Sequence, residues 1–483
     1  MYYLTKLSPK YLIFILFSFL VILLTYFFKD IRFDDPYITF RYAKNLSEGH
    51  GFVFNEGERI LGTTTPLYTL ILACCGLFFK NLPLVSIILS SISLIFLSYF
   101  LYLILNIVNK KIWGVFCAIL IIFNSQTYSC FGLETIFYTM LIYGAILFYL
   151  KDYFYLSTIL LVIAILTRSD AIILIGLILL AYILKNKKFP YKYVSLFLVI
   201  VIPWYLFSFF YFGTFFPSSM SVKTGMSKSI MYVFLMLFED KVVRFLNPIF
   251  GVIKPYYFMF LPLGLLQILN SRKKELIIIP IWTFLHILGY SILRVSPAGC
   301  DWHFYPIFPG LIITSFLGVV FCIERVIVIF SSYKVAKGIL FSFLIFICCF
   351  SIFNSMRYLY EFHNFFPKDE NFGTRYNVYR MFGIWASKNT EENSTIACAD
   401  IGIIGYYSKR KIVDLAGLVT PEMIHHHDDY IWGIKKFKPN LIIYRKQNWK
   451  DPPEIIYTNF PYYLIKTFNE DRKGNVLIFK RKD

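Results

Sequence analysis

The sequence predicts a polytopic α-helical membrane protein with a C-terminal α/β domain, and three observations support this prediction. The chain has 483 residues, of which 58% are hydrophobic and only 16% are charged, a smaller charged share than soluble proteins carry. Apolar runs such as 11–28 and 84–105 are long enough to cross the hydrocarbon core of a bilayer. After residue 353 the sequence becomes polar and contains short β-like strings.

The apolar runs predict about eleven transmembrane helices. Two of the runs, 112–124 and 154–167, are short, which indicates tilted or broken helices. With the N-terminus in the cytoplasm, an odd number of crossings places the C-terminus outside. The predicted spans are approximately 11–28, 83–108, 112–124, 134–150, 154–167, 171–184, 193–212, 250–269, 276–293, 304–323 and 338–353.

The basic residues lie in alternate gaps between the apolar runs. The formal net charge of +19 would by itself also fit a nucleic-acid-binding protein. Because Lys and Arg accumulate in the cytoplasmic loops of membrane proteins, the basic gaps are predicted to be cytoplasmic. The intervening gaps then face outward from the cytoplasmic membrane, and nucleic acid is excluded as a partner. The basic gaps contain Lys6 with Lys10, 109–111, 185–188, 271–274, and Lys334 with Lys337.

The first outer loop, residues 29–82, is the most polar stretch in the first third of the chain. Asp35 and Pro36 match the N-cap and first turn of a helix, which is predicted to end at Gly49. The later segment 66–80 is too short to span easily and is predicted to lie in the outer interface. One face of the first helix is formed, at helical spacing, by Tyr37, Phe40, Arg41 and Lys44.

Two domains are predicted: a membrane module of residues 1–353 and an extracytoplasmic α/β domain of residues 354–483. Within the second domain, a helix is predicted over 377–389. The predicted strands are 394–400, 411–417, 439–445, 462–468 and 475–481.

The nine cysteines do not predict a disulfide framework. Most of them lie in apolar runs, where a free thiol behaves as a small hydrophobic group. A bridge between Cys130 and Cys300 stays open as an alternative.

The outward gaps contain nearly all of the unusual polar residues. A carboxylate near the interface can take a proton from an acceptor hydroxyl, and Arg, Lys or His can hold a phosphate leaving group. Nucleotide-activated donors are absent from that side, so an activated donor there must be linked to a lipid. These polar residues therefore predict group transfer from a lipid phosphate. They are Asp34, Asp35, Glu134, Arg168, Asp170, Lys223, Asp301, Trp302, His303 and Asp414.

The segment DDPYITFRYAKNLSEGHGFVFNEGERILGTTTPLYTLILA resembles the first outer loop of membrane glycosyltransferases of the GT-C superfamily. It is most similar to the branch that includes the terminal arabinofuranosyltransferases. The chain departs from that pattern at Pro36, at Phe52, and at Leu61 with Gly62. The resemblance continues in order through FGLETIFYTML, LTRSDA, FGTFFPSSMSVK, GCDWHFYPIFP and DIGIIGYYSKRKIVDLAGLVTPE.

The resemblance implies a GT-C fold, a polyprenyl-phosphate sugar donor, and an envelope glycan, lipid or protein as acceptor. It implies that Asp34 is the catalytic base of an inverting in-line displacement, and that Asp35 orients it, binds the acceptor or caps the helix. The residues expected at the donor phosphate are Arg168, Arg41, Lys223 and His303. The residues expected to bind substrate are Tyr37, Lys44, Glu134, Asp170, Asp301, Trp302 and Asp414.

Structural roles stay open for several of these residues. Asp35 could serve only as an N-cap, and Arg168 could pair only with Asp170 and orient a turn. Lys223 could contact lipid headgroups. The run from Asp301 to His303 could be an aromatic anchor at the membrane interface.

No metal ligand is predicted. The string HHHDD at 425–429 could bind zinc, but adjacent histidines rarely converge on one ion. A divalent cation, Mg²⁺ or Mn²⁺, at the donor phosphate also stays open.

Two other functions remain as alternatives. One is a transporter or flippase for lipid-linked sugars, which predicts functional residues on both sides of the membrane and internal repeats. The other is a non-catalytic scaffold for envelope assembly, which leaves Asp34 and Arg168 without a task.

Overall fold

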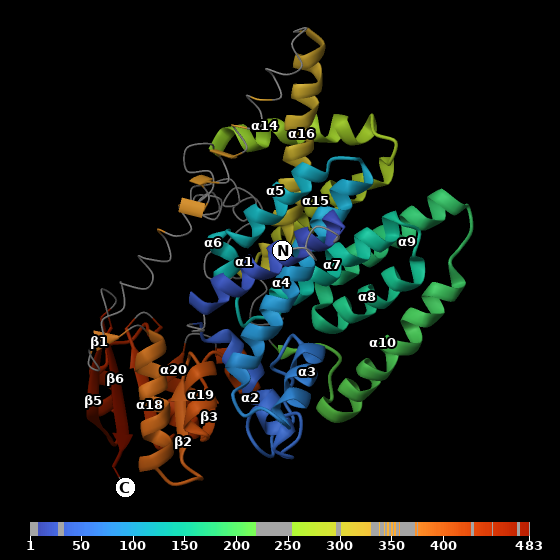
Figure 1. Cartoon of the computed structure of the whole chain (residues 1–483). Coiled ribbons are helices and arrows are strands. Elements are labelled where there is room, and N and C mark those ends of the chain that lie inside the picture. Colours follow the sequence, from blue (N-terminus) through green and yellow to red (C-terminus); the bar gives the residue numbers. More distant parts are fainter. Residues whose placement is uncertain are drawn as a thin grey trace. The chain divides into compact units, whose positions relative to one another are not determined.

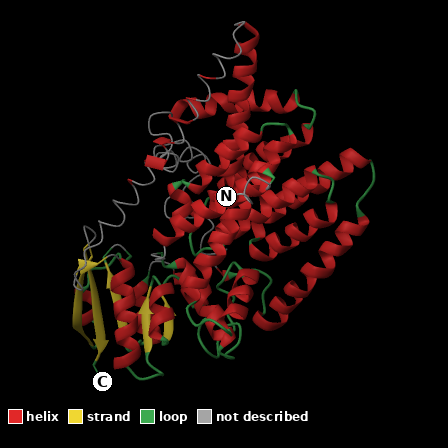
Figure 2. Ribbon diagram, in the orientation of Figure 1, coloured by secondary structure: helices red, strands yellow, loops and turns green. Residues whose placement is uncertain are grey.

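The protein is described here from a computed structural model. The structure describes residues 8–27, 33–218, 254–295, 301–329, 375–426, 429–446, 448–470 and 474–482, with short pieces between 338 and 373. Helices form most of it, and strands occur only towards the C-terminus (Figure 2). The chain divides into two compact units, one formed by 1–29, 86–203 and 225–360, the other by 30–85, 204–224 and 361–483.

The helical part of the chain confirms a mostly helical membrane fold. Six of the described helices are long and apolar enough to cross a membrane, and several shorter apolar helices accompany them. Every predicted span as far as residue 323 coincides with a helix, whereas most of 338–353 lies outside the described residues. The total of about eleven crossings stays a prediction.

Figure 1 labels the helices that lie in the first unit or extend across its boundaries. They are α1 (Pro9–Phe27), α4 (Leu82–Ile107), α5 (Lys111–Ile122), α6 (Ser125–Ser129), α7 (Thr135–Leu150), α8 (Phe154–Thr167), α9 (Ile172–Asn186), α10 (Tyr191–Phe212), α14 (Lys254–Leu269), α15 (Ile278–Ile292) and α16 (Phe308–Ile329).

Small residues let two of these helices approach closely. A Cβ atom at Gly264 of α14 would lie 1.9 Å from the carbonyl oxygen of Thr314, and one at Gly318 of α16 would lie 2.0 Å from that of Phe260. Glycine at such crossings is typical of helix pairs in membranes, where close backbone contact replaces the hydrophobic effect as the source of association.

In the first unit, some contacts connect gaps that the Lys and Arg pattern predicts to lie on the same side of the membrane. Lys185 Nζ lies 2.6 Å from Asp152 Oδ1 and 3.3 Å from Glu275 Oε1, and all three residues belong to gaps predicted to be cytoplasmic. The predicted outward residues Glu134, Arg168 and His303 likewise contact one another. These contacts are compatible with the predicted topology, which stays a prediction.

The topology makes a direct prediction for the side of each gap. An alkaline phosphatase fused at the C-terminus should be active, because that domain is predicted outside the cytoplasm, and one fused within 185–188 should be inactive. A C-terminal fusion that reports the cytoplasm would end the argument for a lipid-linked donor.

The second unit contains α2 (Asp35–Ser47), α3 (Pro66–Gly76) and a six-stranded sheet. The strands run in the order β1 (Phe372–Gly373), β5 (Tyr462–Glu470), β6 (Gly474–Arg481), β4 (Leu441–Arg445), β2 (Thr395–Cys398) and β3 (Lys411–Asp414). Its remaining helices are α18 (Arg375–Asn389), α19 (Gly402–Ser408), α20 (Tyr430–Phe437) and α21 (Glu454–Thr458).

The sheet is mixed, and its parallel part positions the residues discussed below. β3, β2 and β4 are parallel neighbours, whereas β4 with β6 and β5 with β6 are antiparallel. Every residue of β4 is buried, as expected for a strand that is covered on both faces. All five predicted strands appear as β2 to β6, and the helix predicted over 377–389 appears as α18.

Candidate active site

The side chain of Asp34 binds the N-terminus of α19, which is 368 residues further along the chain. Its Oδ2 accepts a hydrogen bond of 2.8 Å from the backbone N–H of Gly402, and its Oδ1 accepts one of 2.8 Å from Ile403. The residue is only 6% exposed. A carboxylate at this position satisfies amides that a helix leaves unpaired and is favoured by the helix dipole. Asp34 therefore anchors the first outer loop to the C-terminal domain.

Only glycine fits at the start of α19. A Cβ atom on Gly402 would lie 2.0 Å from the carbonyl oxygen of Asp34, a separation that no side chain tolerates. The same carbonyl accepts the N–H of Tyr37 at 3.0 Å. The close approach therefore joins the first turn of α2 to α19.

Asp35 is the first residue of α2, and it is only partly buried. The sequence placed the N-cap at Asp35, but the structure places it at Asp34, whose side chain makes no capping bond to its own helix. The correction has a physical reason, since the Asp34 carboxylate is used by α19 instead. The predicted end of the helix agrees, because α2 ends at Ser47 and Gly49 follows with φ +87°.

Arg41 is buried, and its Nε and Nη2 donate to protein acceptors, whereas its Nη1 has no hydrogen-bond partner among the described residues. Its Nε donates to the carbonyl of Phe54 at 2.7 Å, and its Nη2 donates to the carbonyl of Arg410 at 2.7 Å. The guanidinium also lies over the ring of Phe54, 4.4 Å from the centroid. Burial lowers the pKa of Arg41 to about 10. Through these contacts Arg41 connects the first outer loop with the C-terminal domain.

Asn55 makes a second such connection, which the sequence analysis did not single out. Its Nδ2 donates to the carbonyl of Ile412 at 2.9 Å, and its Oδ1 accepts the N–H of the same residue at 3.0 Å. The side chain thus pairs with β3 as a neighbouring strand would. The available signal was the position of Asn55 within the loop pattern that resembles the GT-C enzymes.

Tyr37 and Lys44 belong to an aromatic cluster of the second unit. The Tyr37 hydroxyl donates to the Tyr376 hydroxyl at 3.3 Å. The Tyr37 ring lies 5.5 Å from that of Tyr406, and Lys44 Nζ lies 5.4 Å from the Tyr406 centroid. Burial lowers the pKa of Lys44 from its usual value. Substrate contacts for these two residues stay predictions.

Asp414 lies fully buried at the end of β3 and organises its own loop. Its Oδ1 accepts the N–H of Ala416 and its Oδ2 accepts the N–H of Val419, each at 2.9 Å. Burial raises the pKa of Asp414 to about 6, although the amides oppose that shift. The predicted substrate contact is untested, and the geometry supplies a structural role.

Asp414 should make the stability of the chain depend on pH. An unfolded Asp titrates near 3.9, so the folded state, with a pKa of about 6, binds the proton more tightly. Its contribution to stability is complete below about pH 4 and is lost as the pH rises through about 6, by about 3 kcal/mol. Asp414→Asn should remove this loss, which thermal unfolding of both proteins across that window would measure. Parallel pH curves would contradict the assignment.

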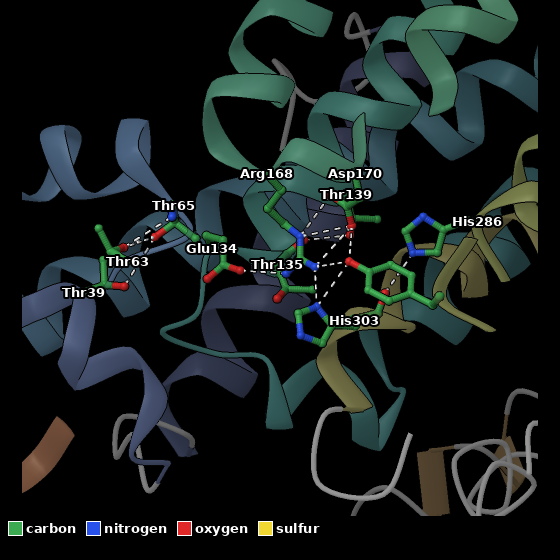
Figure 3. Close-up of polar contacts among 11 residues, drawn as sticks. Thr39, Thr63, Thr65, Glu134, Thr135, Thr139, Arg168, Asp170, His286 and His303 are labelled. Carbon is green, nitrogen blue, oxygen red and sulfur yellow. Dashed lines mark hydrogen bonds and ion pairs between the residues drawn. The ribbon is translucent and has the colours of Figure 1, made fainter. Parts of the chain in front are cut away.

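In the first unit, Arg168 sits at the centre of a buried polar cluster (Figure 3). Its Nη1 donates to Glu134 Oε1 at 2.8 Å, and its Nε and Nη2 lie 3.2 to 3.4 Å from the Asp170 carboxylate. The side chains of Arg168 and Glu134 are 6% and 8% exposed. One cation therefore faces two carboxylates, so its charge is more than compensated.

Tyr290 and His303 complete this cluster. Arg168 Nη2 lies 2.9 Å from the Tyr290 hydroxyl and 2.5 Å from His303 Nδ1. Because Nδ1 must accept from the guanidinium, the proton of the neutral His303 ring lies on Nε2. The Nε2 atom of a second histidine, His286, lies 2.9 Å from the backbone carbonyl oxygen of His303. Arg168 thus holds the end of α8, the start of α7 and residues after α15 together.

The remaining predicted residues are placed as follows. Trp302 is partly buried in a short 3₁₀ helix, Asp301–His303, and the side chain of Asp301 is not described. Lys223 lies outside the described residues. In the HHHDD string, His426 stacks on Trp432 with ring centroids 3.6 Å apart. Among the residues that the structure describes, no three His, Cys, Asp or Glu side chains converge as a metal site.

The fold of the chain is similar to the folds of ArnT and of an oligosaccharyltransferase. The crystal structure of ArnT from Cupriavidus metallidurans bound to undecaprenyl phosphate matches with a TM-score of 0.62 at 12% identity, over 97% of each chain. Its apo state matches with the same TM-score and identity, over 96% of this chain and 97% of that chain. An Archaeoglobus fulgidus oligosaccharyltransferase, tethered to an acceptor peptide with the NVT sequon, matches with a TM-score of 0.55 at 11% identity, over 91% of this chain and 69% of that chain.

Two sequence comparisons complete this result. A family model described as a domain of unknown function (DUF8728) matches residues 370–479, which include most of the C-terminal domain. No curated protein sequence matches the chain. The GT-C superfamily and its arabinofuranosyltransferase-like branch therefore stay predictions, whereas the similarity of the fold to these solved structures is a finding.

Proposed function

We propose that this chain is a membrane glycosyltransferase that moves a sugar from a polyprenyl phosphate to an acceptor of the cell envelope. The observation that supports this most strongly is the fold match to ArnT over 97% of both chains. That neighbour was crystallised with undecaprenyl phosphate, which is a lipid phosphate of the kind that the predicted donor would release. The reaction takes place on the outer face of the cytoplasmic membrane.

The geometry of the aspartate pair favours a division of roles. Both carboxylate oxygens of Asp34 accept backbone N–H groups of α19, so Asp34 is the positioning residue of the pair. Asp35 begins α2 and is more exposed than Asp34. We therefore assign the base to Asp35, whereas the resemblance alone assigns it to Asp34.

The proposed step is a single displacement. The acceptor hydroxyl oxygen attacks the anomeric carbon while its proton passes to the Asp35 carboxylate. The bond between that carbon and the phosphate oxygen breaks, and polyprenyl phosphate leaves from the opposite face. Because no glycosyl–enzyme intermediate forms, the anomeric configuration inverts.

The two arginines predicted for the donor phosphate serve other partners in this structure. Arg168 is outnumbered by two carboxylates, and Arg41 donates to three acceptors in the outer loop and the C-terminal domain. Contacts of Arg168, Arg41, Lys223 and His303 with that phosphate all stay predictions. A divalent cation, Mg²⁺ or Mn²⁺, at the donor phosphate stays a prediction, and we route no step through a metal.

Comparative mass analysis of envelope glycans tests this function. Cells that lack the protein should lose one sugar from one glycan class, and the wild-type gene should restore it. The purified protein in nanodiscs should then release polyprenyl phosphate only when donor and acceptor are both present. Movement of the lipid-linked sugar across vesicles without a glycosylated product would support the flippase alternative instead.

A further inference from the structure

The first unit contains a cavity of about 280 Å³ on the side that is predicted to face the cytoplasm. Two basic gaps that are far apart in the sequence meet there: 109–110, which follows α4, and 271–273, which follows α14. α16 contributes Leu317 and Glu324 to the lining. All of these residues belong to the first unit.

The charges at this cavity are unequal. Lys110 Nζ donates to Glu324 Oε1, and Gln267 Nε2 donates to Glu324 Oε2 at 2.9 Å. Lys110 and Glu324 thus neutralise each other. Within the described part of the chain, Arg272 and Lys273 have no carboxylate within ion-pair distance. Lys273 interacts electrostatically with Glu275, which also pairs with Lys185. The lining nevertheless contains three basic residues and one carboxylate, Glu324, so its net charge is positive.

Apolar side chains also line this cavity, and three of them, Ile268, Leu276 and Leu317, are buried. Basic and apolar side chains in one cavity complement an amphiphile with an anionic head. The volume lies near the lower end of the ~300–1,000 Å³ range of ligand pockets, which suits a headgroup and its glycerol but not a complete lipid.

We propose that this cavity binds the phosphate-ester headgroup of an anionic membrane lipid in the cytoplasmic leaflet. Arg272 and Lys273 hold the phosphate by charge-assisted hydrogen bonds, and the apolar side chains of the lining contact the start of the acyl chains. Basic pockets between transmembrane helices on the cytoplasmic side have this affinity because that leaflet is rich in anionic lipids. The proposal rests on the predicted topology and is independent of the transferase activity.

The test uses the full chain purified in a neutral detergent. Its thermal unfolding is followed while short-chain phosphatidylglycerol is added, and separately short-chain phosphatidylcholine, glycerol phosphate and inorganic phosphate. Phosphatidylglycerol should stabilise the protein at concentrations at which phosphatidylcholine has no effect. Equal stabilisation by glycerol phosphate or inorganic phosphate would replace the lipid with a soluble phosphate ester and overturn the proposal.

A pair of double variants localises the effect. Arg272→Gln with Lys273→Gln should weaken phosphatidylglycerol binding about 30-fold, since each basic residue near the surface contributes about a fivefold factor. Lys188→Gln with Lys192→Gln is the matched control, because both residues are exposed, do not line the cavity, and lie in the predicted cytoplasmic gap between spans 171–184 and 193–212. An equal loss of phosphatidylglycerol binding in the control would mean that general surface charge, and not this cavity, causes the binding. Unchanged binding in the first double variant would also refute the site.

Discussion

Arg168→Ala should destabilise the first unit of the protein by about 3–5 kcal/mol, which is the usual cost of removing one partner from a buried ion pair. The reason is that Glu134 and Asp170 would then lie together in the protein interior with no cation between them. Tyr290 and His303 would lose the donor that they share. Unfolding of the purified protein in detergent, followed by fluorescence against temperature or denaturant, would measure the loss.

A matched control separates burial from charge. Lys185→Ala also removes a cation from two carboxylates, Asp152 and Glu275, but these side chains are 30% to 50% exposed. Because exposed ion pairs contribute at most about 1 kcal/mol, that variant should unfold almost as the wild type does. A similar loss of stability in both variants would contradict the explanation that the burial of Arg168 sets the size of the effect.

A compensating variant tests the same explanation in the other direction. Arg168→Met combined with Glu134→Gln and Asp170→Asn removes all three charges and should recover much of the stability, since neutral replacements of buried ion networks are often tolerated. If Arg168→Ala instead folded normally and lost only the use of the lipid donor, Arg168 would be a phosphate-binding residue, as the sequence analysis expected.

The sequence was sufficient for the elements because their signals are local. Apolar runs predicted the helices as far as α16, and short β-branched strings predicted β2 to β6, since both depend on neighbouring residues. The Arg168 pair with Asp170 was also within reach, because the two residues are two positions apart. Its bonds to Glu134 and His303 span 34 and 135 residues, which no local pattern encodes.

The same limit explains the misplaced N-cap. Asp before Pro is a good helix start, and the local pattern could not show that Asp34 was already required by amides 368 residues away. Asp414 is the opposite case. Its bonds to Ala416 and Val419 are short-range, and an Asp that accepts the N–H two residues on is a familiar turn device. A structural role could therefore have been weighed there from the sequence alone.

The division of roles between Asp34 and Asp35 predicts two kinds of inactive variant. Asp35→Asn should lower sugar transfer by about 10²–10⁴-fold, the usual contribution of a positioned base, with normal expression and unfolding temperature. Asn occupies the same volume and is compatible with the first turn of a helix, so the fold has no reason to change. Transfer is measured as the sugar that envelope mass analysis assigns to this protein.

Asp34→Asn should lower transfer and structural integrity together. Asn keeps one acceptor oxygen, but its NH₂ group would face one of the amides of Gly402 and Ile403, which both donate. Losing such a cap costs about 1 kcal/mol, and the outer loop should become more sensitive to protease. Gly402→Ala, which pushes a methyl group into the Asp34 backbone, should reproduce this phenotype without touching either carboxylate. A dead Asp34→Asn with wild-type protease resistance, beside an active Asp35→Asn, would transfer the base to Asp34. Near-normal transfer in both single variants and in the double variant would refute carboxylate catalysis at this pair.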